Sequence, residues 1–93
     1  MNITRIENPS LWRITLTFAR AISLTDEDLA VELVNDDIQH NTNLSRIILH
    51  EVIRFQKHLQ IFIEGLDSDA RDIAQTLTAN LFCKATLVQH SAR

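Results

Sequence analysis

Four histidines are the residues in this chain best suited to metal binding or to proton transfer near neutral pH. They are His40, His50, His58 and His90, and none belongs to a short ligand spacing such as His-Glu-x-x-His. His50 and His58 could approach each other across a hairpin, but exposed histidines on strands are far commoner than ligands. We therefore predict no metal site and leave the role of the histidines open.

The single cysteine and the single glycine exclude several kinds of site. Cys83 has no second cysteine for a disulfide or a cysteine-based zinc site within one chain. The neighbouring Lys84 could lower the pKa of this thiol, although a buried structural cysteine is the favoured interpretation. Gly65 alone cannot build a Walker loop or a dinucleotide-binding loop, because both need several glycines. We predict no cofactor and no catalytic residue.

Charge and hydropathy limit the class of partner. The 93 residues include 12 acidic and 9 basic side chains, with a formal net charge of −3 and no extended basic patch. The sequence therefore predicts no nucleic-acid partner. One RNA-binding module shares the element order derived below, but here only Phe62 is placed for base stacking and the basic, glycine-containing motif is missing.

No segment has the roughly 20 apolar residues of a membrane span. Residues 1–7 also lack the apolar core of a secretory signal. Together with the lone cysteine, these features predict a small acidic cytoplasmic protein that makes no membrane contact.

The first predicted elements are a strand over residues 11–20 and a helix that starts at Thr25. In the strand, large apolar side chains alternate with polar ones, which is typical of a sheet with one buried face. Thr25 with Asp28 fits a capping box at the helix start. Residues 41–43 supply a polar break that ends the helix. The alternating strand residues are Trp12, Ile14, Leu16 and Phe18 on one face, and Arg13, Thr15 and Thr17 on the other.

A hairpin is predicted next, from residues 44–55 and 59–63, because both runs are rich in isoleucine and valine. Its register stays open. A two-residue turn places Val52 on the same side as Ile61, whereas a three-residue turn places Ile53 and Phe55 there. A helix over 44–55 is the alternative, because its apolar residues also fit a helical stripe.

The last predicted elements are a second helix and a final strand. Gly65 ends the hairpin, where we expect it to adopt a positive φ. An acidic, cappable start at residues 67–69 leads into a narrow apolar stripe that ends at Leu81. Residues 84–89 alternate as a strand, and 91–93 form a tail.

This order predicts an α+β fold: a ferredoxin-like βαββαβ two-layer sandwich with a four-stranded antiparallel sheet and two helices on one face. We interpret residues 1–93 as a single domain with its core over 11–90. Residues 1–10 form an arm, or an extra edge strand over 3–7. Ligand-binding regulatory domains of the ACT kind share this topology, but residues 19–24 lack the glycine expected at their ligand loop.

With both helices on one face, the other sheet face is left open. Its composition is more apolar than a fully solvated face requires, which indicates a contact surface. We predict a non-enzymatic interaction module (adaptor, regulator or assembly factor) that forms a homodimer or binds a protein partner there or on the acidic helix face. The alternative is a small-molecule-binding regulatory domain or cofactor-free enzyme with a pocket at a dimer seam, using Arg13, His50, Glu51 and His58. The predicted partner-binding residues are Arg13, Thr15, Thr17, Gln60, Phe62, Thr86 and Val88, with Ile48 or Val52 as additions.

Overall fold

The computed structural model describes residues 10–41 and 46–90. Its elements follow the order β1 (Ser10–Thr17), α1 (Leu24–His40), β2 (Ile48–Phe55), β3 (His58–Gly65), α2 (Asp67–Leu81) and β4 (Lys84–His90). The possible strand over 3–7, the tail over 91–93 and the start of the predicted hairpin at 44–45 lie outside the described residues.

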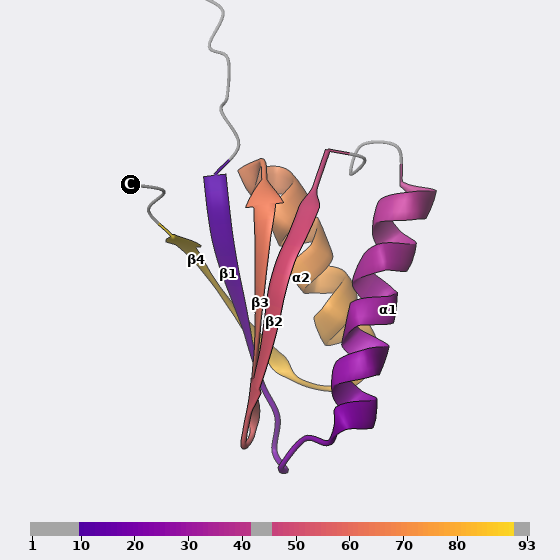
Figure 1. The fold of residues 1–93 in the computed structure, drawn as a ribbon, viewed down its shortest axis with the longest axis vertical. Helices are drawn as coiled ribbons and strands as arrows, with labels where there is room; N and C mark the ends of the chain where they lie inside the picture. The colour runs from indigo at the N-terminus through magenta and orange to yellow at the C-terminus, as the bar shows by residue number, and fades with distance from the viewer. Residues whose placement is uncertain (1–9, 42–45, 91–93) are drawn as a thin grey trace, which may run out of the picture.

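The four strands form one antiparallel sheet in the order β2-β3-β1-β4, and both helices pack on the same face of it (Figure 1). The predicted ferredoxin-like α+β sandwich is therefore confirmed. β1 and β3 occupy the centre of the sheet, and β2 and β4 are its edges. The alternative helix over residues 44–55 is wrong, because Ile48–Phe55 pairs with β3.

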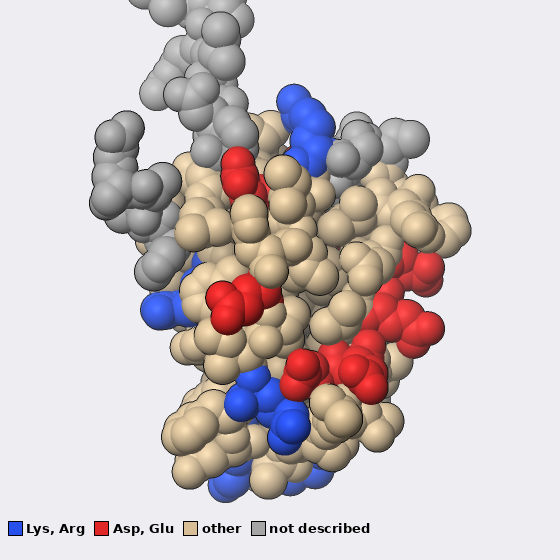
Figure 2. Space-filling model, in the orientation of Figure 1, with Lys and Arg blue, Asp and Glu red and all other residues tan. Residues whose placement is uncertain are grey.

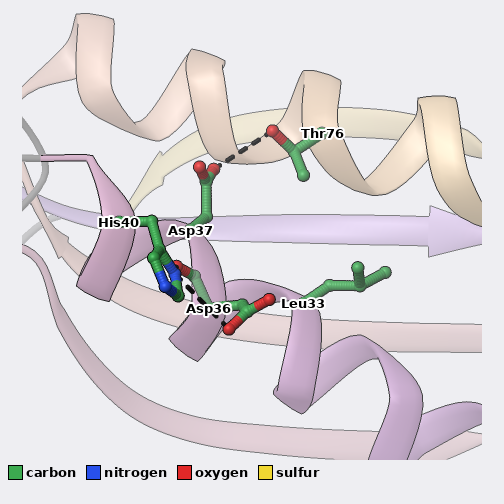
Figure 3. Close-up of a pocket in the computed structure, with 5 residues that line it drawn as sticks. All are labelled: Leu33, Asp36, Asp37, His40 and Thr76. Atoms are coloured by element: carbon green, nitrogen blue, oxygen red, sulfur yellow. Dashed lines mark hydrogen bonds and ion pairs between the residues drawn. The ribbon is translucent and has the colours of Figure 1, made fainter.

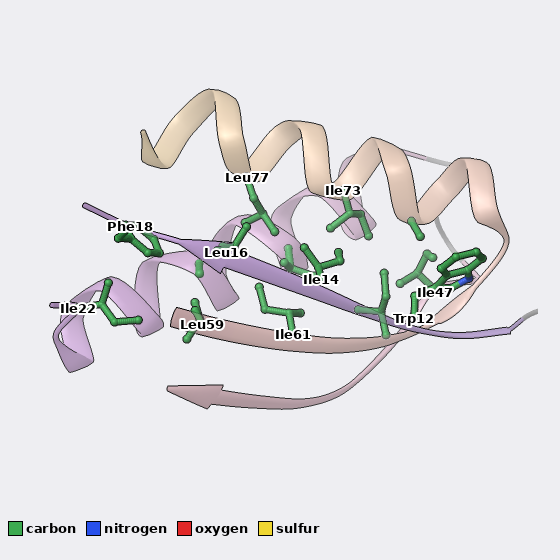
Figure 4. Close-up of a cluster of buried hydrophobic side chains, with 14 residues drawn as sticks. Trp12, Ile14, Leu16, Phe18, Ile22, Ile47, Leu59, Ile61, Ile73 and Leu77 are labelled. Atoms are coloured by element: carbon green, nitrogen blue, oxygen red, sulfur yellow. The ribbon is translucent and has the colours of Figure 1, made fainter. Parts of the chain in front are cut away.

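The core fills the space between the two layers with apolar side chains from β1, β3, both helices and the adjoining segments, while Leu49 and Val52 of β2 and Ala85 and Leu87 of β4 are partly buried at its margin. Alternate residues of β1 and β3 point toward the helices because side chains change sides at each residue of a strand. Figure 4 shows this arrangement. The buried residues are Trp12, Ile14, Leu16, Phe18, Ile22, Ala30, Val34, Ile47, Leu59, Ile61, Ile63, Ala70, Ile73 and Leu77.

The hairpin has the two-residue turn. Phe55 pairs with His58, so Gln56 and Lys57 form the turn and Val52 pairs with Ile61 on the helix side. Val52 is therefore not part of the open face. Gln56 adopts a positive φ of 55°, a conformation that favours glycine or asparagine, and this explains why the turn lacks a recognisable sequence signal.

The first helix begins earlier than predicted. Ser23 is its N-cap and forms a capping box with Asp26, whereas the prediction placed the cap at Thr25. β1 also ends earlier, at Thr17, although the amide of Phe18 still donates to the carbonyl of Lys57 in the β2–β3 turn at 2.9 Å.

The prediction of a positive φ at Gly65 is wrong, since the described part of the chain has no glycine in that region. Glycine is needed there for another reason: a β-carbon would collide with the Cδ1 atom of Ile47. The Gly65 carbonyl accepts a hydrogen bond of 3.0 Å from Trp12 Nε1. The following helix, α2, begins at Asp67 with an acidic first turn, as predicted, but its N-cap is Leu66 and no side chain caps it, so the predicted capping is wrong.

Candidate interaction face

The structure places all seven predicted partner-binding residues on the sheet face opposite the helices, which we call the open face. Arg13 on the central strand β1 pairs with Phe62 on one side and with Val88 on the other. Two residues further along, Thr15 pairs with Gln60 and Thr86. The intervening residues of β1 are buried in the core, so strand alternation places this set on the opposite surface.

The most exposed large apolar side chains of the open face lie on β2, where the sequence analysis named Ile48 as an addition but not Ile53 or Phe55. Ile48, Ile53 and Phe55 are 52%, 40% and 63% exposed, and all three alternate with residues that face the helices. The two-residue turn places them there, because the length of the turn decides which side chains of β2 lie on the same face as those of β3. Phe62 on β3 is half-buried, and Val88 on β4 is exposed.

Charged residues divide the open face into two halves. Glu51 and Glu64 lie on β2 and β3, whereas Arg13 and Lys84 lie on β1 and β4. Oε1 of Glu64 lies 2.9 Å from Nε2 of His50. No ion pair within the described residues joins Arg13, Glu51 or Lys84 to an opposite charge. The Nε atom of Arg13 is buried and has no hydrogen-bond acceptor in this part of the chain.

The hollows described below are not lined by the groups proposed for a small-molecule site. His50 contacts Glu64, and His58 Nδ1 lies 3.3 Å from Thr17 Oγ1, so both histidines belong to the open face. Arg13 and Glu51 are on the same face. Across residues 10–41 and 46–90 no cluster of three or more histidine, cysteine or acidic side chains could hold a metal ion.

Two hollows lie outside the centre of the open face, the first between the helices and the second beside Thr17 and Lys84 at the end of that face. A hollow between the helices is lined by Asp36, Asp37 and His40 of α1 and by Thr76 of α2, whose hydroxyl donates to Asp37 Oδ2 at 3.1 Å (Figure 3). A second hollow lies at the start of β4, next to Phe82, which is 94% exposed and has a positive φ of 52°.

Acidic side chains gather over α1 (Figure 2). Residues 24–40 contain six aspartates and glutamates and no lysine or arginine. The acidic helix surface is therefore on the side of the molecule away from the open face.

Cys83 lies between Phe82 and Lys84, half-buried against the edge of the core. Burial raises the pKa of its thiol, because desolvation disfavours the thiolate. The positive charge of Lys84 does not reverse this effect. The structure thus supports the interpretation of Cys83 as a packing residue over that of a nucleophile.

No helix among the described residues is both long and apolar enough to span a membrane.

Comparison with known proteins concerns the fold alone. No protein-family model matches the chain, and no curated protein matches it. Among solved structures, the chain is similar to the de novo designed protein Ferredog-Diesel, with a TM-score of 0.51 and 9% sequence identity over 95% of this chain and 92% of that one. This similarity supports the ferredoxin-like arrangement of the sheet and its two helices.

Proposed function

We propose that this chain is a small non-enzymatic interaction module, an adaptor, regulator or assembly factor, that binds a protein partner or a second copy of itself through the open face. One observation carries the proposal: Ile53 and Phe55 expose large apolar side chains next to each other on β2, and Ile48 exposes a third beyond Glu51. Contiguous exposed apolar surface on a small protein is typical of an interaction site.

The energetic benefit of covering this surface is substantial. Full burial of one large aliphatic or aromatic side chain is worth about 1.5–3 kcal/mol. Because each of the three side chains on β2 is about half exposed, a partner could gain roughly 1 kcal/mol from each of them. This gain offsets part of the entropic cost of association.

The packing of the described residues supports a binding role over a catalytic one. The space between the layers is filled by apolar side chains, and Asp69 is the one buried polar residue among those the structure describes. The half-buried Cys83, with its raised pKa, is a poor nucleophile. With a single cysteine and no span-forming helix in the described residues, we further propose a cytoplasmic location.

The test replaces aromatic residues on the open face and, separately, a more exposed aromatic elsewhere. We expect Phe55→Asp and Phe62→Asp to weaken association, measured by light scattering coupled to size-exclusion chromatography and by binding to a partner purified with the wild-type chain. Phe82→Asp is the matched control, because Phe82 is exposed but lies outside the open face. Equal association of all three variants and the wild-type chain would reject the open face as the contact.

A further inference from the structure

We infer that the open face binds a second copy of this chain, with the two sheets stacked about a two-fold axis that runs along the strands between β1 and β3. The inference rests on the proposed function, because it uses the same face, and it adds the identity and orientation of the partner.

The division of charge on the open face is the first argument. The β2–β3 half carries Glu51 and Glu64, and the β1–β4 half carries Arg13 and Lys84. A two-fold axis along the line between the halves places the acidic half of one copy over the basic half of the other. Both copies then present complementary potentials, as a closed symmetric interface requires.

The shapes of the two halves also match. The β2–β3 half projects large side chains, among them Ile53, Phe55 and Phe62. On the β1–β4 half, Thr15 and Thr86 form a lower row between the rows of Arg13 and Lys84. Stacking one half on the other places Ile53 of one copy opposite Thr86 of the other, and no large apolar side chain lies directly opposite another.

The register of the sheet specifies the contacts. Arg13 and Phe62 are directly opposite across β1 and β3, so the axis between these strands carries Arg13 of each copy onto Phe62 of the other. Arg13 has no ion-pair partner in the described residues, and its guanidinium could lie on the aromatic ring with Glu51 nearby. At the end of the face, Phe55 would lie opposite Lys84 in the same row.

Edge-to-edge pairing through β2 fits the structure less well. The ladder between β2 and β3 is irregular between Leu49 and Glu51, and irregular edges oppose strand addition. α1 packs on the β2 side of the sheet, so pairing of two β2 edges would bring two acidic helices toward each other. Stacking through the open faces keeps these helices on the outer surfaces of the dimer.

The size of the face predicts a dimer of moderate affinity. Four strands about 4.8 Å apart and about seven residues rising about 3.4 Å each give roughly 450 Å² of projected area. Standard interfaces bury about 800 Å² per partner. We therefore expect dissociation on dilution within the micromolar range.

The experiment uses two variants, and in each of them the four charged residues Arg13, Glu51, Glu64 and Lys84 of the open face have the same sign. One variant carries Arg13→Glu and Lys84→Glu, which makes the charges of its open face acidic. The other carries Glu51→Lys and Glu64→Lys, which makes them basic. We expect each variant alone to be monomeric at concentrations at which the wild-type chain has twice its 10.7 kDa mass, and an equimolar mixture to recover that doubled mass. Glu32→Lys on α1 is the control and should dimerise like the wild-type chain.

Circular dichroism checks that each variant is folded. Arg13 is partly buried, so Arg13→Glu could unfold the chain. In that case the single variants Lys84→Glu and Glu51→Lys are mixed instead, and the mixture should recover the doubled mass to a smaller extent. Folded variants that fail to associate in the mixture, or that dimerise separately as well as the wild-type chain does, would overturn the stacked arrangement.

If the wild-type chain dimerises and Phe55→Asp abolishes that association, the proposed function stands and only the arrangement fails. A wild-type chain that stays monomeric throughout this range overturns the second copy as partner, and the aromatic variants then test the open face with other proteins.

Discussion

The side chain of Ile47 occupies the space in which a β-carbon of Gly65 would lie, so these two residues limit each other's size. We expect Gly65→Ala to destabilise the fold by about 1–3 kcal/mol, the usual cost of overpacking a core. Chemical unfolding measures this change. Gly65 has no positive φ, so the cost would come from crowding alone.

A double variant checks that explanation. Ile47→Val removes the Cδ1 atom that meets the added carbon and should cost about 0.5–1.5 kcal/mol by itself. Ile47→Val together with Gly65→Ala should be clearly more stable than the sum of the two single effects predicts. Strict additivity would show that crowding by Ile47 is not the cause.

The capping of α1 gives a second prediction, with a matched control two residues away. Ser23 Oγ accepts the amide hydrogen of Asp26 at 3.3 Å, so Ser23→Ala should lower the free energy of unfolding by about 1 kcal/mol. Thr25→Ala should have a much smaller effect, because Thr25 lies inside the helix. Similar losses from both variants, measured by thermal unfolding, would contradict the observed cap.

Asp26 gives a prediction on pH. Two hydrogen bonds from Arg20, of 2.8 and 3.0 Å, and one from the Ser23 amide hold the pKa of Asp26 well below its ordinary value of 3.8. A carboxyl whose pKa is lowered by folding stabilises the fold above its unfolded pKa and loses that contribution as the pH falls through its folded pKa.

The stability difference between the wild-type chain and Asp26→Asn should therefore be constant above about pH 5 and should shrink as the pH falls below about 4. Urea unfolding at a series of pH values measures it. Asp28→Asn, on the exposed face of the same helix turn, is the control. A difference that grows on acidification would reverse the sign and contradict the assigned interactions.

Cys83 should react slowly with alkylating agents. Because burial raises the pKa of its thiol, little thiolate is present near neutral pH. We expect carbamidomethylation by iodoacetamide, followed by mass spectrometry, to be several-fold slower in the folded chain than in urea. A folded chain that reacts faster than the unfolded one would revive the interpretation of Cys83 as an activated thiol.

The sequence predicted the fold and the seven face residues through side-chain periodicity. Alternation in β1 separates Trp12 and Ile14 from Arg13 and Thr15, and this assignment needs no information about neighbouring strands. The face could be predicted because each strand of the sheet has one buried side. Ile53 and Phe55 of β2 could not be assigned to the face because Gln56 adopts a positive φ without being glycine, so nothing in the sequence marks the length of the turn.

Element ends depended on contacts between distant segments. Ser23 and Thr25 each have an aspartate three residues later, so either could begin a capping box. Ser23 is the N-cap in the structure, and its capping-box partner Asp26 also accepts two hydrogen bonds from Arg20. At Gly65, the decisive neighbour is Ile47, eighteen residues earlier, and no local pattern reveals it.

The hydrogen bonds between the hairpin turn at residues 56–57 and the segment from Phe18 to Ile22 also bear on how the protein can be engineered. The carbonyls of Gln56 and Lys57 accept the amide hydrogens of Ile22 and Phe18, at 3.0 and 2.9 Å. An epitope tag inserted into this short hairpin turn, ordinarily a tolerant position, would leave both donors without acceptors and detach the segment that leads into the first helix. Labels and fusion partners are better joined to the chain elsewhere.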